Sequence, residues 1–341
     1  MTSVKEFRVD TPATADSLGR GTFVFTDDYS IFDWGKMPDT IPNKGASLCA
    51  MGAANFERLE DAGVPTHYRG VRSGSEVVTT DEVIDPPREM AIDLTRTPDL
   101  PYESGSYDYA AFHEVAGENY LIPLEIVFRN TVPIGSSLRS RGNPGDFGLN
   151  YDEWPDEPID LEEPLVEFSS KFEESDRYLT ENNAAYVAGE ADLDELEAIA
   201  HRVNEILTER AAEVGMKHED GKIECLYYDG EIRVADVVGT FDENRFSYDG
   251  QQLSKEVIRQ YHIRTQPTWV EAVDEAKTQA KDDPEVADWR QLCEIEPEPL
   301  PDHVVDAVRE MYTSGANAYL GWELFGAPPL DEAVEVIRSL S

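Results

Sequence analysis

The chain has 341 residues and a formal net charge of −41 at neutral pH, from 70 acidic against 29 basic side chains. A nucleic-acid binder needs a basic surface to displace counterions from phosphates, and anionic membranes also repel an acidic protein, so both classes of partner are excluded. Hydrophobic residues make up 40% of the chain and aromatic residues 10%, which provides a core and excludes a disordered protein. Lysine is scarce, and many carboxylates with few lysines indicate adaptation to high salt, where a Debye length of about 3 Å at 1 M weakens repulsion.

Length and cysteine usage narrow the class further. Single cores stop growing at roughly 250 to 300 residues, so the chain predicts one large domain or two closely packed ones. The cysteines are odd in number and lack a CxxC spacing, which indicates reduced, mostly buried thiols. No stretch approaches the roughly 18 apolar residues of a membrane-spanning helix, and no apolar signal segment is seen, so we expect a cytoplasmic protein. The cysteines are Cys49, Cys225 and Cys293.

The first half of the chain predicts β structure with one helix. An apolar run at Phe23 to Phe25 predicts a strand, and a second strand is expected from Tyr120 to Arg129. From Ala46 to Ala62 the apolar residues fall on one helical face, which predicts a helix. The segment from Ser136 to Pro164 is rich in glycine and proline and is expected to be loop.

The second half predicts a helix, a hairpin and a closing helix. The helix is expected from Leu193 to Val214, with Asp192 as its cap. Two alternating runs around Asp229-Gly230 predict a β-hairpin. An acidic segment from Gln266 to Pro301 has the composition of an insertion, and a last long helix is expected from Asp302 to Tyr319.

Lys222, Glu224 and Asp236 lie on this hairpin, and the length of its loop decides how they relate. A two-residue turn at 229–230 places the two carboxylates on opposite faces, because side chains alternate with period two. A three-residue loop at 228–230 places both on one face, with Cα atoms roughly 7 to 8 Å apart. They can then hold Mg²⁺, which takes one or two carboxylates with phosphate oxygens and water. The alternative is an exposed hairpin in an acidic chain.

Two segments can bind anions through backbone amides and guanidinium groups. Gly19-Arg20-Gly21 can surround a phosphate, although it lacks the spacing of a P-loop and an ordinary loop is the alternative. Arg129 ends the second predicted strand, and the turn PIGSS that follows it offers amides and hydroxyls to a phosphate or carboxylate. A structural arginine is the alternative there. The histidines show no metal-binding spacing, and no GxSxG motif supports a serine hydrolase.

Three segments together resemble a known family. They are TDDYSIFDWGKMPDTIPNKG, LIPLEIVFRNTVPIGSS, and DGKIE followed by Asp236, and they resemble the SAICAR synthetase (phosphoribosylaminoimidazole-succinocarboxamide synthase) family. LPDHVVDAVREMY resembles the closing helix of the same family. Several motifs in one order are more specific than any single motif. Arg20 and Thr22 replace two lysines usual in the family's nucleotide loop, and one extra residue before Gly135 leaves Ser136 and Ser137 as alternatives for one position.

The resemblance implies an ATP-dependent ligase of purine biosynthesis that joins L-aspartate to carboxyaminoimidazole ribonucleotide (CAIR) and yields SAICAR, ADP and phosphate. ATP would phosphorylate the substrate carboxylate, and the amine of aspartate would then displace phosphate. Mg²⁺ would be held by Glu224 and Asp236. The other implied roles are catalytic for Lys222, Asp33 and Lys44, substrate-binding for Arg129, Ser136, Arg245 and Asp242, and ATP-binding for Gly19, Arg20, Gly21 and Lys222.

The resemblance also implies an α+β fold of two parts. A mostly antiparallel N-terminal sheet domain, residues 1–120, would cover the nucleotide, and a larger α/β domain, residues 121–341, would hold substrate and metal, with the nucleotide cleft between them. Insertions are expected near 142–164 and 264–298. Two other functions stay open: another ATP-dependent carboxylate ligase or kinase on the same scaffold, and a non-catalytic nucleotide-binding protein. The oligomeric state, a homo-oligomer included, is also open.

Overall fold

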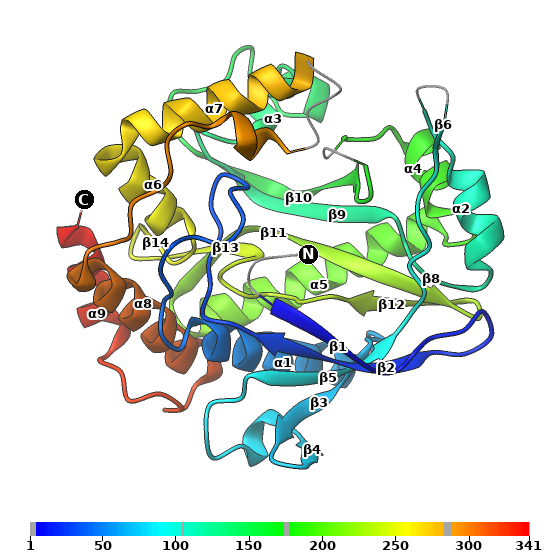
Figure 1. Cartoon of the computed structure of the whole chain (residues 1–341), viewed down its shortest axis with the longest axis horizontal. Coiled ribbons are helices and arrows are strands. Elements are labelled where there is room, and N and C mark those ends of the chain that lie inside the picture. Colours follow the sequence, from blue (N-terminus) through cyan, green and yellow to red (C-terminus); the bar gives the residue numbers. More distant parts are fainter. Residues whose placement is uncertain (1–4, 104–105, 174–176, 283–287, 341) are drawn as a thin grey trace.

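The first sheet is antiparallel and is formed by the N-terminal part of the chain. In the computed structural model, which describes residues 5–103, 106–173, 177–282 and 288–340, this sheet lies beside a second sheet, and helices pack around both (Figure 1). The predicted strand at Phe23 is confirmed as β2. In spatial order the strands are β1 (Lys5–Thr11), β2 (Gly19–Phe25), β5 (Glu89–Leu94), β3 (Tyr68–Ser73) and β4 (Glu76–Val78).

The second sheet is built around one long strand, β11, which pairs with β9, β13, β8 and β12, each time antiparallel. Pro123 has no N–H to donate and interrupts the single strand predicted from Tyr120 to Arg129, so β8 and β9 pair with different parts of β11. The strands are β8 (Asn119–Leu121), β9 (Leu124–Val132), β10 (Ile159–Ser170), β11 (Met216–Tyr228), β12 (Glu231–Ala235), β13 (Asn244–Tyr248) and β14 (Gln251–Gln252). A separate small hairpin pairs β6 (Tyr102–Glu103) with β7 (Ser106–Tyr107).

The predicted long helices are confirmed as α1, α5 and α8, and Asp192 caps α5 by accepting a hydrogen bond from the Glu195 amide at 3.0 Å. The helices are α1 (Lys44–Asp61), α2 (Tyr109–Ala116), α3 (Ser137–Arg141), α4 (Glu181–Ala188), α5 (Leu193–Glu213), α6 (Glu256–Thr265), α7 (Pro267–Asp282), α8 (Asp302–Leu320) and α9 (Leu330–Ser339). Short 3₁₀ turns are η1 (Thr80–Glu82), η2 (Pro144–Phe147) and η3 (Trp289–Leu292).

Two segments contain more regular structure than expected. The segment predicted as loop from Ser136 to Pro164 contains α3, η2 and the start of β10. The expected insertion after Gln266 contains the 16-residue helix α7, whose apolar residues Trp269, Val273 and Ala276 recur at helical spacing and are buried. Glycine and proline content hid the first segment, whereas the second was judged by its acidic composition and not by the spacing of its apolar residues.

The core joins the two sheets. α1 packs on β2, β3 and β5 and also contacts α5 and α8, so one buried cluster includes residues from both sheets. The α+β fold is therefore confirmed, while the domain boundary at residue 120 stays a prediction. All three cysteines are free thiols, and Cys49 and Cys225 are buried, as expected. Within the described ranges, no helix combines the length and the apolar character that crossing a membrane requires.

Candidate active site

The hairpin of β11 and β12 has a two-residue turn, which is the first of the two alternatives that the sequence left open. Tyr228 pairs with Glu231, and the register continues without a shift to Glu224 opposite Ala235. Both turn residues, 229 and 230, have positive φ values, 50° and 84°, as a type I′ turn requires. In a regular strand this register would direct Asp236 and Glu224 to opposite faces.

Glu224 and Asp236 nevertheless line one cavity of about 220 Å³ between the two sheets. β12 ends at Ala235, and Asp236 takes a left-handed conformation with φ 62°, which breaks the alternation and redirects its carboxylate. The two carboxylates are therefore neighbours, as predicted, but the cause is a local change of backbone direction and not the hairpin register.

Each of these carboxylates forms an ion pair with a lysine. Lys171 contacts Glu224, and Lys5 contacts Asp236. Burial and the nearby charge of Asp236 raise the pKa of Glu224 to about 7. Burial also opposes ionisation of Asp236, but the Lys5 ammonium outweighs it and holds the pKa of Asp236 below its usual value. The pair fits the small number of carboxylates that Mg²⁺ takes beside a nucleotide, and the described residues contain no larger group of metal-ligating side chains.

An apolar slot continues from this charged end. Ile92 and Leu94 of β5 face Leu121 and Leu226 of the second sheet across the cavity. An adjoining cavity of about 650 Å³ shares Phe7 and Leu94 with it and extends along residues 95–99, which follow β5. An apolar slot that ends at two carboxylates and two ammonium groups suits a ligand with a flat base at one end and phosphates at the other.

The segment Gly19-Arg20-Gly21 serves mainly the packing of the first sheet. A Cβ on Gly19 would lie 2.4 Å from the Thr11 carbonyl oxygen, and one on Gly21 would lie 2.9 Å from the Leu94 methyl groups. The Arg20 side chain points to the face of the sheet opposite to that of Phe23, because the two residues are three positions apart. Its Nη1 lies 3.0 Å from Asp93 Oδ1. Asp93 lines the small cavity, whereas neither Gly21 nor Arg20 is among the residues that line it.

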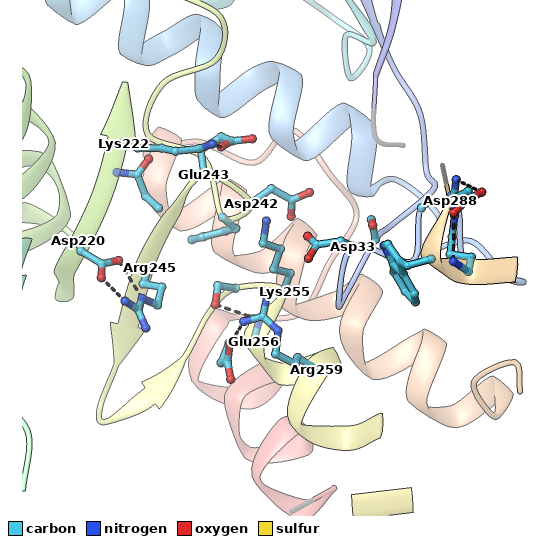
Figure 2. Close-up of a pocket in the computed structure, with 17 residues that line it drawn as sticks. Asp33, Asp220, Lys222, Asp242, Glu243, Arg245, Lys255, Glu256, Arg259 and Asp288 are labelled. Atoms are coloured by element: carbon cyan, nitrogen blue, oxygen red, sulfur yellow. Dashed lines mark hydrogen bonds and ion pairs between the residues drawn. The ribbon is translucent and has the colours of Figure 1, made fainter. Parts of the chain in front are cut away.

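A larger cavity, of about 870 Å³, has Lys222, Asp242 and Arg245 in its lining (Figure 2). One face of β11 carries the side chains of Asp220, Lys222 and Glu224, because every second residue of a strand points to the same side. Asp220 and Lys222 line the large cavity and Glu224 the small one, so the two cavities meet on this strand.

Lys222 supplies a fixed positive charge where the cavities meet. Its Nζ lies 2.5 Å from Glu125 Oε1 and 3.7 Å from Glu243 Oε2. Burial disfavours the ammonium, but Glu243 and Glu125 outweigh burial and raise the pKa of Lys222 above its ordinary value. Lys222 therefore stays charged and does not act as a general base.

Two predicted arginines meet on Asp220. Asp220 lies opposite Arg129 on β9 and opposite Arg245 on β13, so the three side chains share one face of the sheet. Arg245 Nε donates to Asp220 Oδ1 at 2.8 Å, and Arg129 Nη1 lies 3.8 Å from Asp220 Oδ2. Arg245 lines the large cavity; Arg129, which is buried and also bonds Glu167 at 3.0 Å, lies behind it.

The two candidate serines lie next to each other at the start of α3. The Ser136 hydroxyl caps α3 by accepting a hydrogen bond from the Leu138 amide and keeps its own hydrogen to donate. The Ser137 hydroxyl lies 3.5 Å from Arg129 Nη2. Ser137 is thus the serine that contacts Arg129, and the substrate-binding role of Ser136 stays a prediction.

Lys44 is not among the residues that line the large cavity, and its predicted catalytic role stays a prediction. Its side chain is fully buried, and its Nζ lies 2.5 Å from Asp242 Oδ2. The Tyr312 hydroxyl donates to Asp242 Oδ1 at 2.7 Å. Burial opposes ionisation of Asp242, but Lys44 and then Lys255 outweigh it and lower the pKa of Asp242. Lys44 thus holds Asp242, which does line the cavity, in place.

Asp33 and Lys255 also line the large cavity, and Figure 2 labels both. Asp33 is 85% exposed and pairs with Lys277 at 2.7 Å. Among the lysines whose side chains the structure describes, Lys255 alone lacks a carboxylate within 4 Å, although its charge helps to lower the pKa of Asp242. In a chain of charge −41, an ammonium group in a cavity without a direct ion pair indicates a place for an anionic ligand.

Sequence reasoning missed several charged residues of the site, among them Lys5, Lys171, Lys255, Glu125, Asp220 and Glu243. Glu125 was visible, because it stands four residues before Arg129 in a predicted strand and so shares its face. The three lysines have no motif of their own in the sequence. What marks them in the sequence is the rarity of lysine, because each lysine in so acidic a chain is a candidate ligand for an anion.

Comparison with known proteins agrees with this geometry. The SAICAR synthetase family matches residues 13–276. The chain is 40% identical over its whole length to a putative phosphoribosylaminoimidazole-succinocarboxamide synthase of Archaeoglobus fulgidus, of which it covers 99%, and 28% identical over 85% of its length to the synthase of Thermoplasma acidophilum, of which it covers 89%.

Solved structures show the same fold. SAICAR synthase of Saccharomyces cerevisiae in complex with SAICAR superposes with a TM-score of 0.62, at 20% identity over 95% of this chain and 94% of that one. A SAICAR synthetase in complex with ADP superposes with a TM-score of 0.55, at 24% identity over 88% of this chain and 99% of that one. The family match, the full-length relative and the shared fold together show that this chain belongs to the SAICAR synthetase family.

Proposed function

We propose that the protein ligates L-aspartate to CAIR with ATP, forming SAICAR, ADP and phosphate. One observation supports this most: Lys222 and Glu224, side by side on one face of β11, line two different cavities. ATP in the smaller, apolar-walled cavity would have its phosphates at Glu224, and a carboxylate substrate in the larger cavity would meet them at Lys222. The ADP and SAICAR complexes of relatives are consistent with ligands of both kinds.

The chain's own residues would position the reactants and balance charge. Lys5 and Lys171 would contact the phosphates of ATP once these displace the carboxylates from them. Lys222 would stabilise the charge that develops on the transferring phosphoryl group and on the acyl phosphate. Bound between Glu224, Asp236 and the nucleotide, Mg²⁺ would neutralise the β and γ phosphates. The amine of aspartate would then attack the acyl carbon and release phosphate.

The arginine end of the large cavity would hold the ribonucleotide. Asp220 lies between Arg129 and Arg245, and Arg129 is also paired with Glu167, so Arg245 would supply the positive charge that faces a substrate. Arg245 donates to Asp220 through Nε and Nη2, and its remaining Nη hydrogens would be the donors to a phosphate group. Asp33 and Lys255 at the opposite end would bind the ammonium and a carboxylate of aspartate.

Lys255→Ala should raise the KM for aspartate about 10- to 100-fold, because a hydrogen bond to a charged group contributes about 1.5 to 3 kcal/mol. Steady-state kinetics with each substrate varied in turn provide the measurement, and the KM for ATP should change less than twofold. Lys255→Arg should retain most of the affinity. An unchanged KM for aspartate in Lys255→Ala would remove Lys255 from the aspartate site.

The overall assignment is tested by incubating the purified protein in molar KCl with Mg-ATP, CAIR and aspartate while ADP release is followed. ADP release that needs all three substrates is the expected result. ADP release without aspartate would favour a kinase on the same scaffold, and ADP release with another amine or carboxylate would favour a different ligase. No turnover with retained ATP binding would favour a non-catalytic nucleotide-binding protein.

The charge of −41 is proposed as an adaptation to high salt, with the enzyme working in the cytoplasm. Raising KCl from 0.1 to 2 M should raise the melting temperature by roughly 4 °C, equivalent to about 3 kcal/mol for a chain of this length, because screening relieves repulsion among the surface carboxylates. Thermal unfolding followed by circular dichroism measures this, with sucrose of equal osmolality as the control. An equal rise in sucrose would contradict the electrostatic cause.

A further inference from the structure

The loop that carries Asp33 is strained. Phe32 and Asp33 both have left-handed backbone conformations, with φ 53° and 56°, although neither is glycine. Two such residues in succession are uncommon and persist only where the surroundings hold them. Asp33 and Gly35 of this loop line the large cavity, so the strain lies at the site itself.

Aromatic side chains of α7 and η3 hold the residues around Asp33. The Phe32 ring packs edge-on against Trp269 of α7, with centroids 5.5 Å apart. The Trp34 ring lies between Trp269 and Trp289, at 5.7 and 5.8 Å. Arg290 of η3 donates from Nη1 to the Trp34 carbonyl oxygen at 3.2 Å. The backbone on both sides of Asp33 is thereby tied to these two elements.

The Asp33 carboxylate itself is held by Lys277. Lys277 Nζ lies 2.7 Å from Asp33 Oδ2, and no other described residue donates to or pairs with this carboxylate. The ammonium also lies 5.1 Å from the centroid of the Trp289 ring, so the lysine is steadied by a cation–π contact. Its side chain is 27% exposed, against 85% for Asp33, which leaves the rest of the carboxylate open to the cavity.

We propose that α7 and η3 form a clamp that orients Asp33 toward the second substrate, and that Lys277 is the positioning residue of this clamp. The inference rests on the proposed function, in which Asp33 binds the ammonium group of aspartate. It also gives a role to the segment expected as an insertion near 264–298. Lys277 and η3 lie beyond residue 276, where the family match ends, so this part of the clamp is not covered by the family pattern.

Lys277→Ala should lower kcat/KM for aspartate about 10- to 100-fold, because a small displacement of a positioning group has effects of this size. The KM for ATP should stay within twofold, and Lys277→Arg should recover most of the activity. The melting temperature should change by less than about 2 °C, since a partly exposed ion pair contributes little stability. Lys217→Ala, which removes an exposed ion pair with Asp160, is the matched control and should leave kinetics unchanged.

A double-mutant cycle with Asp33 tests whether Lys277 acts through Asp33 or only stabilises the protein. In the Asp33→Asn background, Lys277→Ala should cause no further loss of kcat/KM for aspartate. An equal loss of kcat/KM in both backgrounds, or wild-type kinetics of Lys277→Ala, would overturn the proposal. If the wild-type protein shows no aspartate-dependent turnover, the proposed function fails. A crystal structure of Lys277→Ala then tests separately whether the clamp orients Asp33. A displaced Asp33 carboxylate would support the clamp, and an unmoved one would refute it.

Discussion

Glu224→Gln should lower turnover at least about 1,000-fold, because the amide removes one of the two negative charges that face the cation-binding end of the nucleotide slot. The fold should survive the change. The pKa of Glu224 is raised to about 7 by burial and by Asp236, so ionisation near neutral pH costs folding free energy, and a neutral amide should not destabilise the protein. Steady-state ADP release and thermal unfolding measure the two effects.

The control for this substitution lies on the same hairpin. Glu231 is exposed on β12 and pairs with Arg233 beside it, so Glu231→Gln should leave turnover within twofold of wild type. When Mg²⁺ is titrated, the turnover of Glu224→Gln should depend less strongly on the metal concentration than the turnover of wild type. Normal turnover in Glu224→Gln would exclude this carboxylate from any metal or phosphate role.

Lys222→Met should lower kcat about 100- to 10,000-fold, because it removes the positive charge where the two cavities meet. It should also destabilise the protein by about 1 to 3 kcal/mol, since Glu125 and Glu243 lose the ammonium that they share. Single-turnover ADP formation and denaturant unfolding report the two losses separately.

A second substitution separates catalysis from charge balance at Lys222. Lys222→Met combined with Glu125→Gln removes the ammonium and one of its carboxylate partners, so stability should return toward wild type. Turnover should stay low, because no cation replaces Lys222. Recovery of turnover together with stability would mean that Lys222 only neutralises Glu125 and has no part in phosphoryl transfer.

The family and the main elements could be predicted from the sequence because their signals are local. Periodicity predicted α1, α5 and α8, and Asp192 was visible as a cap. The hairpin was predicted from Asp229-Gly230, since a turn with two positive φ values favours these residues. The exact loop length was not predictable, because both registers keep the apolar residues of the hairpin alternating.

The site was only partly predictable, because several of its residues depend on long-range packing. Lys44 belongs to a family motif, yet it is buried against Asp242, almost two hundred residues away in sequence. Arg20 also looked like a phosphate ligand, yet Asp93 on the neighbouring strand holds it on the other face of β2. A motif shows that a charged residue matters, but its partner decides whether it faces a ligand or supports a residue that does.

The sequence by itself determined the family, the α+β class and the identity of most charged residues at the site, because these are recorded in local order and spacing. Only the tertiary structure decided that Glu224 and Asp236 meet through the left-handed turn at Asp236, and that α7 and η3 hold Asp33. The physical reason is that backbone direction at a strand end and contacts between distant segments depend on the packing of the whole chain. The bulk charge of −41 is visible in composition, whereas the one unpaired ammonium described, that of Lys255, is visible only in three dimensions.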